Sequence, residues 1–225
     1  MPKQTFFNLP DDKREQILDV VIDEFAENDY ANVSISRIVA NAGIAKGSFY
    51  QYFDDKDDLY SYLFDLIVEA KAEMFSLNQP DPQHIGIFAY MRWILRNSVQ
   101  FELKHPRFSK IGYRMMKGGA QANVLMSRSQ GRQQQFYQQL VILGKQQGDI
   151  ASDIDSEVGA YILEMLISDL GRFMIERTLR EQGEEQFGQT PFFEIPKNKQ
   201  MFEQTLRILE FGMGVRNPEN KVLDI

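Results

Sequence analysis

One short stretch of the chain, KGSFYQYF, carries the side chains whose chemistry is easiest to name. At about 100° per residue in a helix, Phe49 and Phe53 fall on one side and Gln51 falls almost opposite them. The Gln51 amide has both a donor and an acceptor, which is the pair that suits an adenine edge. Tyr50 and Tyr52 flank Gln51 and can donate hydroxyl hydrogens to phosphate oxygens. The stretch therefore predicts a short helix that packs with one face and contacts nucleic acid with the other.

Small and cationic residues complete this pattern. Gly47 lies one turn from Gln51 on the same outward face, where the missing side chain would let the helix approach the floor of a groove. Lys46 and Lys56 place positive charge on both sides of the stretch, and Ser34 can offer a hydroxyl and a backbone N–H to a phosphate. The alternative is that the tyrosines are half-buried rings of an ordinary helical bundle. A single tyrosine would favour that interpretation, whereas the whole run does not.

Short helices must position these side chains, and helical periodicity dominates the chain. We expect helices at 12–28, 34–43 and 45–53, with a longer fourth helix after residue 54. The residues that would cap or end these helices are Asp12 with Glu15, Ser34, Gly43, and Asp54 or Asp55. Two short helices joined by a tight turn are the outline of a helix-turn-helix, whose second helix enters the major groove of DNA.

The segment 34–59, SISRIVANAGIAKGSFYQYFDDKDDL, resembles the DNA-binding region of the TetR family of bacterial transcriptional regulators. The similarity rests on the capped short helix, Ala-Gly, Lys-Gly, Ser, an aromatic residue, Tyr, and the closing Phe and Lys, and it covers roughly residues 10–75. It implies phosphate contacts at Ser34, Tyr50, Tyr52 and Lys56, and base or groove-floor contacts near Lys46, Gly47, Ser48 and Gln51. Arg37 completes the predicted DNA-contacting set.

The charge is unevenly distributed along the chain, which has a net charge of −7. Residues 1–60 carry 6 Lys/Arg against 12 Asp/Glu, whereas residues 103–148 carry 8 Lys/Arg and no acid. DNA binding must therefore depend on a few local cations, with modest non-specific affinity and steep salt dependence. The basic stretch also raises the hypothesis that Arg107, Arg114 or Arg128 meets an anionic group of an effector, although a solvated positive face is the simpler interpretation.

The composition argues against catalysis. The chain has no cysteine and two histidines, His84 and His105, so nucleophilic triads lack parts. It also has no phosphate-binding glycine loop and no metal-ligand spacing, so we expect no enzyme, metal or cofactor. No apolar run is long enough for a membrane span, and the first residues do not resemble a signal peptide, which favours a cytoplasmic location. A helical small-molecule-binding or adaptor protein without operator binding is the alternative function.

The predicted fold is all-α, with an N-terminal three-helix helix-turn-helix domain at 1–76 joined to a larger helical ligand-binding and dimerisation domain at 77–225. The boundary is placed at the break in helical pattern between Asn78 and Pro82. Further helices are expected at 83–104, 107–116, 121–147, 156–181 and 198–214, with a polar and aromatic connector at 181–196.

The larger domain would bind an unidentified small, largely apolar effector. Aromatic and methionine residues of its first three helices and of 156–181 could line the pocket, although such residues are often plain core. They are Trp93, Phe101, Phe108, Tyr113, Met116, Phe136, Tyr137 and Met165.

The family resemblance also implies that helices 156–181 and 198–214 pair with those of a second subunit in a four-helix bundle. The predicted interface residues are Ile162, Leu166, Leu170, Phe173, Phe202, Leu206, Leu209 and Met213, some of which could equally be core of one subunit. One short recognition helix reads few bases, so a dimer on a pseudo-palindromic operator is expected. The function expected is that of a ligand-responsive repressor.

Overall fold

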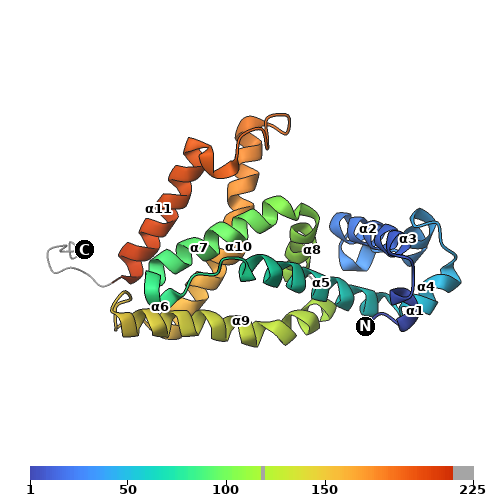
Figure 1. The fold of residues 1–225 in the computed structure, drawn as a ribbon, viewed down its shortest axis with the longest axis horizontal. Helices are drawn as coiled ribbons and strands as arrows, with labels where there is room; N and C mark the ends of the chain where they lie inside the picture. Colours follow the sequence, from blue (N-terminus) through green and yellow to red (C-terminus); the bar gives the residue numbers. More distant parts are fainter. Residues whose placement is uncertain (118–119, 215–225) are drawn as a thin grey trace. The chain divides into compact units, whose positions relative to one another are not determined.

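The computed structural model describes residues 1–117 and 120–214, and of residues 120–130 and 132 the backbone only. The described chain is helical and contains no β-strand, which confirms the all-α expectation (Figure 1). The elements are α1 (Gln4–Phe7), α2 (Asp11–Glu27), η1 (Tyr30–Asn32), α3 (Ile35–Asn41), α4 (Lys46–Tyr52), α5 (Lys56–Ser76), α6 (Pro82–Ile85), α7 (Ile87–Lys104), α8 (Pro106–Lys117), α9 (Ala120–Gln147), α10 (Ser156–Gln182), η2 (Phe192–Glu194) and α11 (Pro196–Met213). No helix among the described residues is long and apolar enough to cross a bilayer.

The chain divides into two compact units. The first contains Met1–Leu77 and Lys104–Gln130, and the second contains Asn78–Leu103 and the described residues from Gly131 onward. The N-terminal helices therefore share one unit with α8, although α8 lies far from them in sequence.

The core of the first unit is rich in aromatic rings. Phe25 of α2, Ile38 of α3, Phe49 of α4 and Leu63 of α5 are each no more than 2% exposed, as is Phe53 directly after α4. Burial of one such side chain stabilises a fold by about 1.5–3 kcal/mol. Because a seven-residue helix is marginal on its own, α4 depends on this packing.

The N-terminus differs from the prediction at two places. Helix α2 begins at Asp11 with Pro10 in the N-cap position, so the predicted capping box at Asp12 is wrong. Asp12 lies instead in the first turn, where a negative charge still favours the helix N-terminus. The sequence patterns also missed α1, whose Phe6 is completely buried.

In the second unit, the helix expected at 83–104 is interrupted at Gly86, which has a φ of 80°. The Asp149 carboxylate accepts a hydrogen bond of 2.8 Å from the N–H of Ile87 and so caps the start of α7. Two shorter helices, α6 and α7, replace the predicted one because this cap and the left-handed glycine favour a break at that point.

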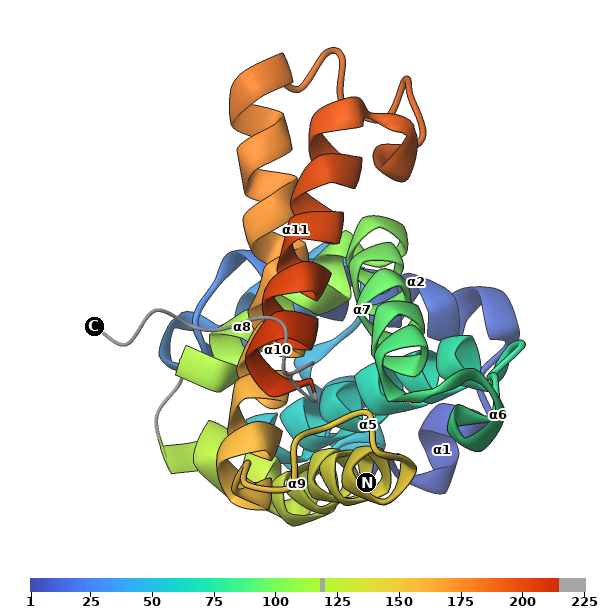
Figure 2. The same cartoon turned by 90° about the vertical axis from the view of Figure 1, so that its left-hand side faces the viewer.

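Helices α10 and α11 lie side by side in the second unit (Figures 1 and 2). Residues between them include η2, where the ring of Phe193 lies 5.2 Å from that of Phe202 on α11. The hydroxyl of Thr178 on α10 donates to the Asn198 side-chain oxygen on α11 over 2.9 Å, and both residues are buried. The pair is therefore joined by a satisfied polar contact as well as by apolar packing.

Candidate nucleic-acid interface

Helices α3 and α4 are joined by a tight turn that the sequence placed correctly. The N–H of Arg37 donates to the Ser34 hydroxyl oxygen at 3.4 Å, which confirms Ser34 as the N-cap of α3. Gly43 follows α3 with a φ of 62°, and the N–H of Ile44 donates to the Val39 carbonyl at 3.0 Å. Asp55 caps α5 by accepting from a backbone N–H, as one of the two candidates predicted. This is the backbone of a helix-turn-helix.

The two faces of α4 are distinct. Phe49 is buried in the core on one side, while the other side is exposed and is made up of Lys46, Gly47, Tyr50 and Gln51. Ser48 and Tyr52 are half-buried between the two faces. The predicted separation into inward phenylalanines and an outward polar group is confirmed for these side chains.

Gly47 is not required by the protein's own packing. A methyl carbon built at this position would have no neighbour within 4 Å in the described part of the chain, outside the adjoining residues and the helix's own backbone. Glycine is less favourable than alanine inside a helix by about 1 kcal/mol. The glycine is therefore better explained by a molecule that approaches the outside of α4 than by the fold.

The two tyrosines of α4 differ in their surroundings. Tyr50 is 44% exposed and its ring stands edge-on to Phe49 at 5.3 Å. Tyr52 is half-buried, with its ring 5.9 Å from that of Phe6. The aromatic body of Tyr52 therefore supports the helix, and the sequence pattern alone did not reveal its partner.

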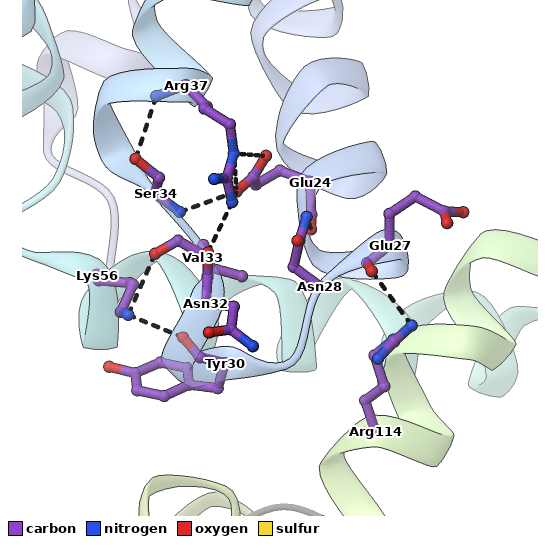
Figure 3. Close-up of polar contacts among 10 residues, drawn as sticks. All are labelled: Glu24, Glu27, Asn28, Tyr30, Asn32, Val33, Ser34, Arg37, Lys56 and Arg114. Carbon is purple, nitrogen blue, oxygen red and sulfur yellow. Dashed lines mark hydrogen bonds and ion pairs between the residues drawn. The ribbon is translucent and has the colours of Figure 1, made fainter.

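Arg37 is held by Glu24 on α2 (Figure 3). Its Nε lies 3.1 Å from each carboxylate oxygen, and its Nη2 lies 2.6 Å from Oε1 and 2.6 Å from the Asn32 carbonyl oxygen. The N–H of Ser34 donates to the same carboxylate at 2.8 Å. The expectation that this N–H is offered to a phosphate is therefore wrong, and the charge of Arg37 is already paired.

Glu24 is the functional neighbour that the sequence patterns missed. Burial of this carboxylate opposes its charge, but the hydrogen bonds from Arg37 and Ser34 outweigh burial and keep the pKa of Glu24 below its ordinary value. The position of Glu24 could have revealed this role, because it lies three residues after Val21 and seven after Ile17, on the apolar face of α2. A lone acid on a buried stripe predicts a paired charge.

Lys56 connects the start of α5 to η1 (Figure 3). Its ammonium donates to the carbonyl oxygens of Tyr30 at 2.8 Å and Val33 at 3.3 Å, and it lies 4.3 Å from the centre of the Tyr30 ring. A phosphate contact by Lys56 would thus come from a side chain that also fixes the turn before α3.

The basic residues of α8 face acids on α2 and shortly after its end. Arg107 pairs with Asp19 at 2.7 Å and with Asp23 at 2.8 Å. Arg114 pairs with Asp29 at 2.5 Å and donates to the Ala26 carbonyl oxygen at 3.1 Å. These contacts do not support the hypothesis that either arginine binds an anionic group of an effector. The two arginines also do not form a solvated positive face, because their charges are paired with acids of the same unit. Arg128 lies outside the described side chains.

Comparison with known proteins agrees with this geometry. Residues 17–63 match the model of the bacterial regulatory proteins of the tetR family, and residues 85–214 match that of the tetracyclin repressor-like C-terminal domain. The chain belongs to the TetR family. The sequence-based identification is confirmed, and the chain is a DNA-binding transcriptional regulator by class.

A solved TetR family transcriptional regulator from Chloroflexus aurantiacus J-10-FL is 38% identical, with a TM-score of 0.79, and the similarity covers 96% of this chain and all of that one. The fatty acid metabolism regulator protein of Bacillus subtilis (strain 168) is 40% identical over 52 residues, which are 23% of this chain and 27% of that protein. The chain thus aligns with about a quarter of the length of the curated relatives it matches.

A structure of FadR from Bacillus subtilis in complex with stearoyl-CoA is 14% identical, with a TM-score of 0.65 over 88% of this chain and 98% of that one. At this identity the likeness shows a shared TetR fold. Among the described residues no cluster of acidic, histidine or cysteine side chains could hold a metal ion.

The residues that the sequence predicted to line an effector pocket are distributed over both units. Phe108, Tyr113 and Met116 belong to the first unit, and the other five predicted residues belong to the second. Phe101 and Tyr137 are buried, Trp93, Phe108 and Tyr113 are half-buried, and Met116, Phe136 and Met165 are exposed. A recess of about 230 Å³ in the first unit is lined by Ile22 and residues 104–108. The pocket lining stays a prediction.

The predicted dimer residues need a correction. Phe202, Leu206, Leu209 and Met213 are each at most 5% exposed and form the inner face of α11, and Leu170 is also buried. The outer face of α11 instead carries Ile208 and Phe211, which are 73% and 62% exposed. The sequence correctly predicts that Phe202, Leu206, Leu209 and Met213 share one face of the helix. Helical spacing alone, however, does not reveal which of two apolar faces packs against the protomer's own core.

Helix α10 exposes a larger apolar set. Ile162 and Phe173 are exposed, as predicted, and Leu166 is half-buried. The exposed large apolar side chains of this helix are Val158, Tyr161, Ile162, Met165 and Phe173. Met165, which was assigned to the effector pocket, therefore belongs to this outer surface.

Proposed function

We propose that this TetR-family chain is a ligand-responsive repressor that binds a pseudo-palindromic operator as a homodimer, with α4 of each subunit in the major groove. The observation that carries the proposal is the exposed polar face of α4 around Gly47, because the fold itself has no use for a glycine there. A short helix without a side chain at this point can lie closer to the base edges.

The contacts divide into reading and positioning. The Gln51 amide would read a base edge, since it offers a donor and an acceptor from the centre of the exposed face. Lys46 and Ser48 would lie near the groove floor, and the hydroxyls of Tyr50 and Tyr52 would contact phosphates. Ser34, Arg37 and Lys56 would support this interface from its edge, because each of them already fixes the backbone around α3.

The dimer would form through the outer faces of α10 and α11. Tyr161, Met165, Ile208 and Phe211 are each more than half exposed, although they are large apolar side chains. Monomeric proteins rarely expose so much apolar surface in one region, and such surface marks association sites. Two subunits would also present two recognition helices, which gives the operator its two-fold symmetry.

Residues 1–76 would serve DNA binding, and 77–225 would bind an effector and dimerise. We infer a small, largely apolar effector from the predicted aromatic side chains on α7 and α9, of which Phe101 and Tyr137 are buried. The relative of known structure that holds stearoyl-CoA has the same fold. The effector would lower operator affinity if it binds better to the conformation in which the recognition helices are wrongly spaced.

The test is sequence-specific binding. The purified chain is used to select duplexes from a randomised pool, and the Kd of the selected duplex is measured by fluorescence anisotropy. Gln51→Ala should weaken discrimination at one base position by about 1–3 kcal/mol, and Tyr50→Phe should weaken binding to all sequences alike. If the wild-type chain enriches no sequence at low salt, the adaptor alternative is favoured and the regulator proposal fails.

A further inference from the structure

The last three residues of α4 have carbonyl groups that the helix does not satisfy. The N–H of Phe53 donates to the Phe49 carbonyl at 2.9 Å and completes the last helical hydrogen bond. The N–H of Asp54, which a longer helix would direct to Tyr50, donates to the Asp58 carboxylate at 3.2 Å. Helix C-termini leave such carbonyls for other donors.

Residues near the start of the chain supply those donors. The backbone N–H of Lys3 donates to the Tyr52 carbonyl at 2.8 Å, and the Lys3 ammonium donates to the Tyr50 carbonyl at 2.9 Å. The Thr5 hydroxyl donates to the carbonyl between them, that of Gln51. Three successive carbonyls of the recognition helix are thus bound by two residues that lie more than forty positions away in sequence.

Packing and charge reinforce these hydrogen bonds. The completely buried ring of Phe6 lies 5.0 Å from that of Phe53 and 5.9 Å from that of Tyr52, and α1 lies against α4 (Figure 1). The Lys3 ammonium is 2.8 Å from the Asp54 carboxylate. A cation at this end also complements the partial negative charge of the helix C-terminus.

Among the described residues, no contact of this kind supports the opposite end of α4. Its N-cap residue is Ala45, which has no side-chain acceptor, and Gly47 in the first turn lowers the intrinsic stability of the helix. A helix of this length needs external contacts to hold one conformation. The contacts at the C-terminal end of α4 therefore fix the orientation of its exposed face.

We propose that Lys3, Thr5 and Phe6, here called the α4 clamp, position the recognition helix and so set the affinity for the operator. Lys3, Thr5 and Phe6 are positioning residues, and they act on the backbone of Tyr50, Gln51 and Tyr52, whose side chains would contact DNA. The inference rests on the proposed function for its effect on DNA, while the clamp itself acts in the free protein. The hydrogen bonds orient α4 before DNA binds. Without them, α4 would lose conformational entropy on binding, and this loss would weaken the affinity.

The experiment uses full-length variants that leave the core intact. Thr5→Val removes the hydroxyl at nearly constant volume, Lys3→Met removes the ammonium, and Thr5→Ser keeps the donor. Gln4→Met is the matched control, because the Gln4 amide donates to Asn8 at the end of α1 and not to α4. Amide hydrogen exchange of residues 46–53 is measured without DNA, and the Kd is measured for the duplex selected by the wild-type chain.

Thr5→Val and Lys3→Met should each speed exchange in α4 and weaken operator binding by about 2- to 10-fold, as expected for one lost hydrogen bond. Thr5→Ser and Gln4→Met should match the wild type in both measurements. The slope of log Kd against log salt should stay unchanged in Lys3→Met, because a positioning lysine releases no counterion, whereas a phosphate-binding lysine would lower the slope by about one unit.

Unchanged exchange in Thr5→Val and Lys3→Met would overturn the clamp, and so would faster exchange with an unchanged Kd. A lowered salt slope in Lys3→Met would reassign Lys3 to direct phosphate binding and remove it from the clamp. If the wild-type chain selects no duplex, the proposed function fails, whereas the exchange measurement still decides whether the clamp holds α4.

Discussion

Glu24 and Arg37 form an ion pair in which one carboxylate receives three guanidinium contacts from the neighbouring helix. Glu24 is 8% exposed, whereas the Arg37 side chain is 51% exposed. The same carboxylate accepts the N–H of Ser34 at the start of α3. One side chain of α2 therefore fixes both the N-cap residue and the first turn of the helix that precedes the recognition helix.

This arrangement predicts a stability loss on Glu24→Gln. The substitution removes the charge while the polar groups around it stay partly buried, so we expect the free energy of unfolding to fall by about 1–3 kcal/mol. Asp11→Asn is the control, since Asp11 pairs with Arg14 at 2.6 Å but is 83% exposed, and the loss there should stay below about 1 kcal/mol. Urea denaturation measures both, and equal small losses would contradict the structural role of Glu24.

The lowered pKa of Glu24 predicts a pH dependence. The carboxyl group of Glu24 has a lower pKa in the folded state than in the unfolded state. Its contribution to the free energy of unfolding is therefore fully present above the ordinary glutamate pKa of about 4.3, and it is lost as the pH falls through the lower folded pKa. Urea denaturation between pH 3 and pH 6 should show stability rising with pH. The free energy of unfolding of Glu24→Gln should rise less steeply over this range than that of the wild type. An identical slope would show that Glu24 does not cause the pH dependence.

Gly47→Ala should separate folding from DNA binding. Alanine favours the helix, and the space around the position is open, so the variant should be more stable by about 0.5–1 kcal/mol. Operator affinity should fall about tenfold or more, because the added methyl group keeps α4 from the groove floor. Gly112→Ala on α8 is the matched control, since a methyl carbon there also has open space, and its operator affinity should be unchanged. Full affinity in Gly47→Ala would contradict the placement of this face in the groove.

The outer face of α11 predicts the effect of charge on dimerisation. Ile208→Glu and Phe211→Glu should shift the chain from dimer to monomer in sedimentation velocity experiments, because each places a charge on a surface that the proposed interface buries. Lys199→Glu, at an exposed position about 180° around the same helix from Ile208, should leave the dimer intact. The monomers should remain folded, since the inner stripe that includes Leu206 is untouched. Dimers that survive both apolar substitutions would place the interface elsewhere.

Local signals in the sequence were enough to place the helix-turn-helix. Ser34 at an N-cap, Gly43 after the helix and the spacing of Phe49 and Phe53 depend only on neighbours within about four residues, so they can be read without a structure. The same locality explains why the ends of α3 and α4 agree closely with the prediction. The Asp12 cap failed because Pro10 takes the N-cap position of α2, two residues earlier.

What the sequence by itself determined about this protein is its class: an all-α TetR chain with a polar face on a short, aromatic-anchored helix. The tertiary structure decided which charges are already paired, as for Arg37 with Glu24, and which stripe of α11 faces the protomer's own core. It also brought Thr5 to the backbone of Gln51. The physical reason is that a helix's periodicity fixes which side chains share a face, whereas the partner of that face depends on segments that are distant in sequence and meet only when the chain folds.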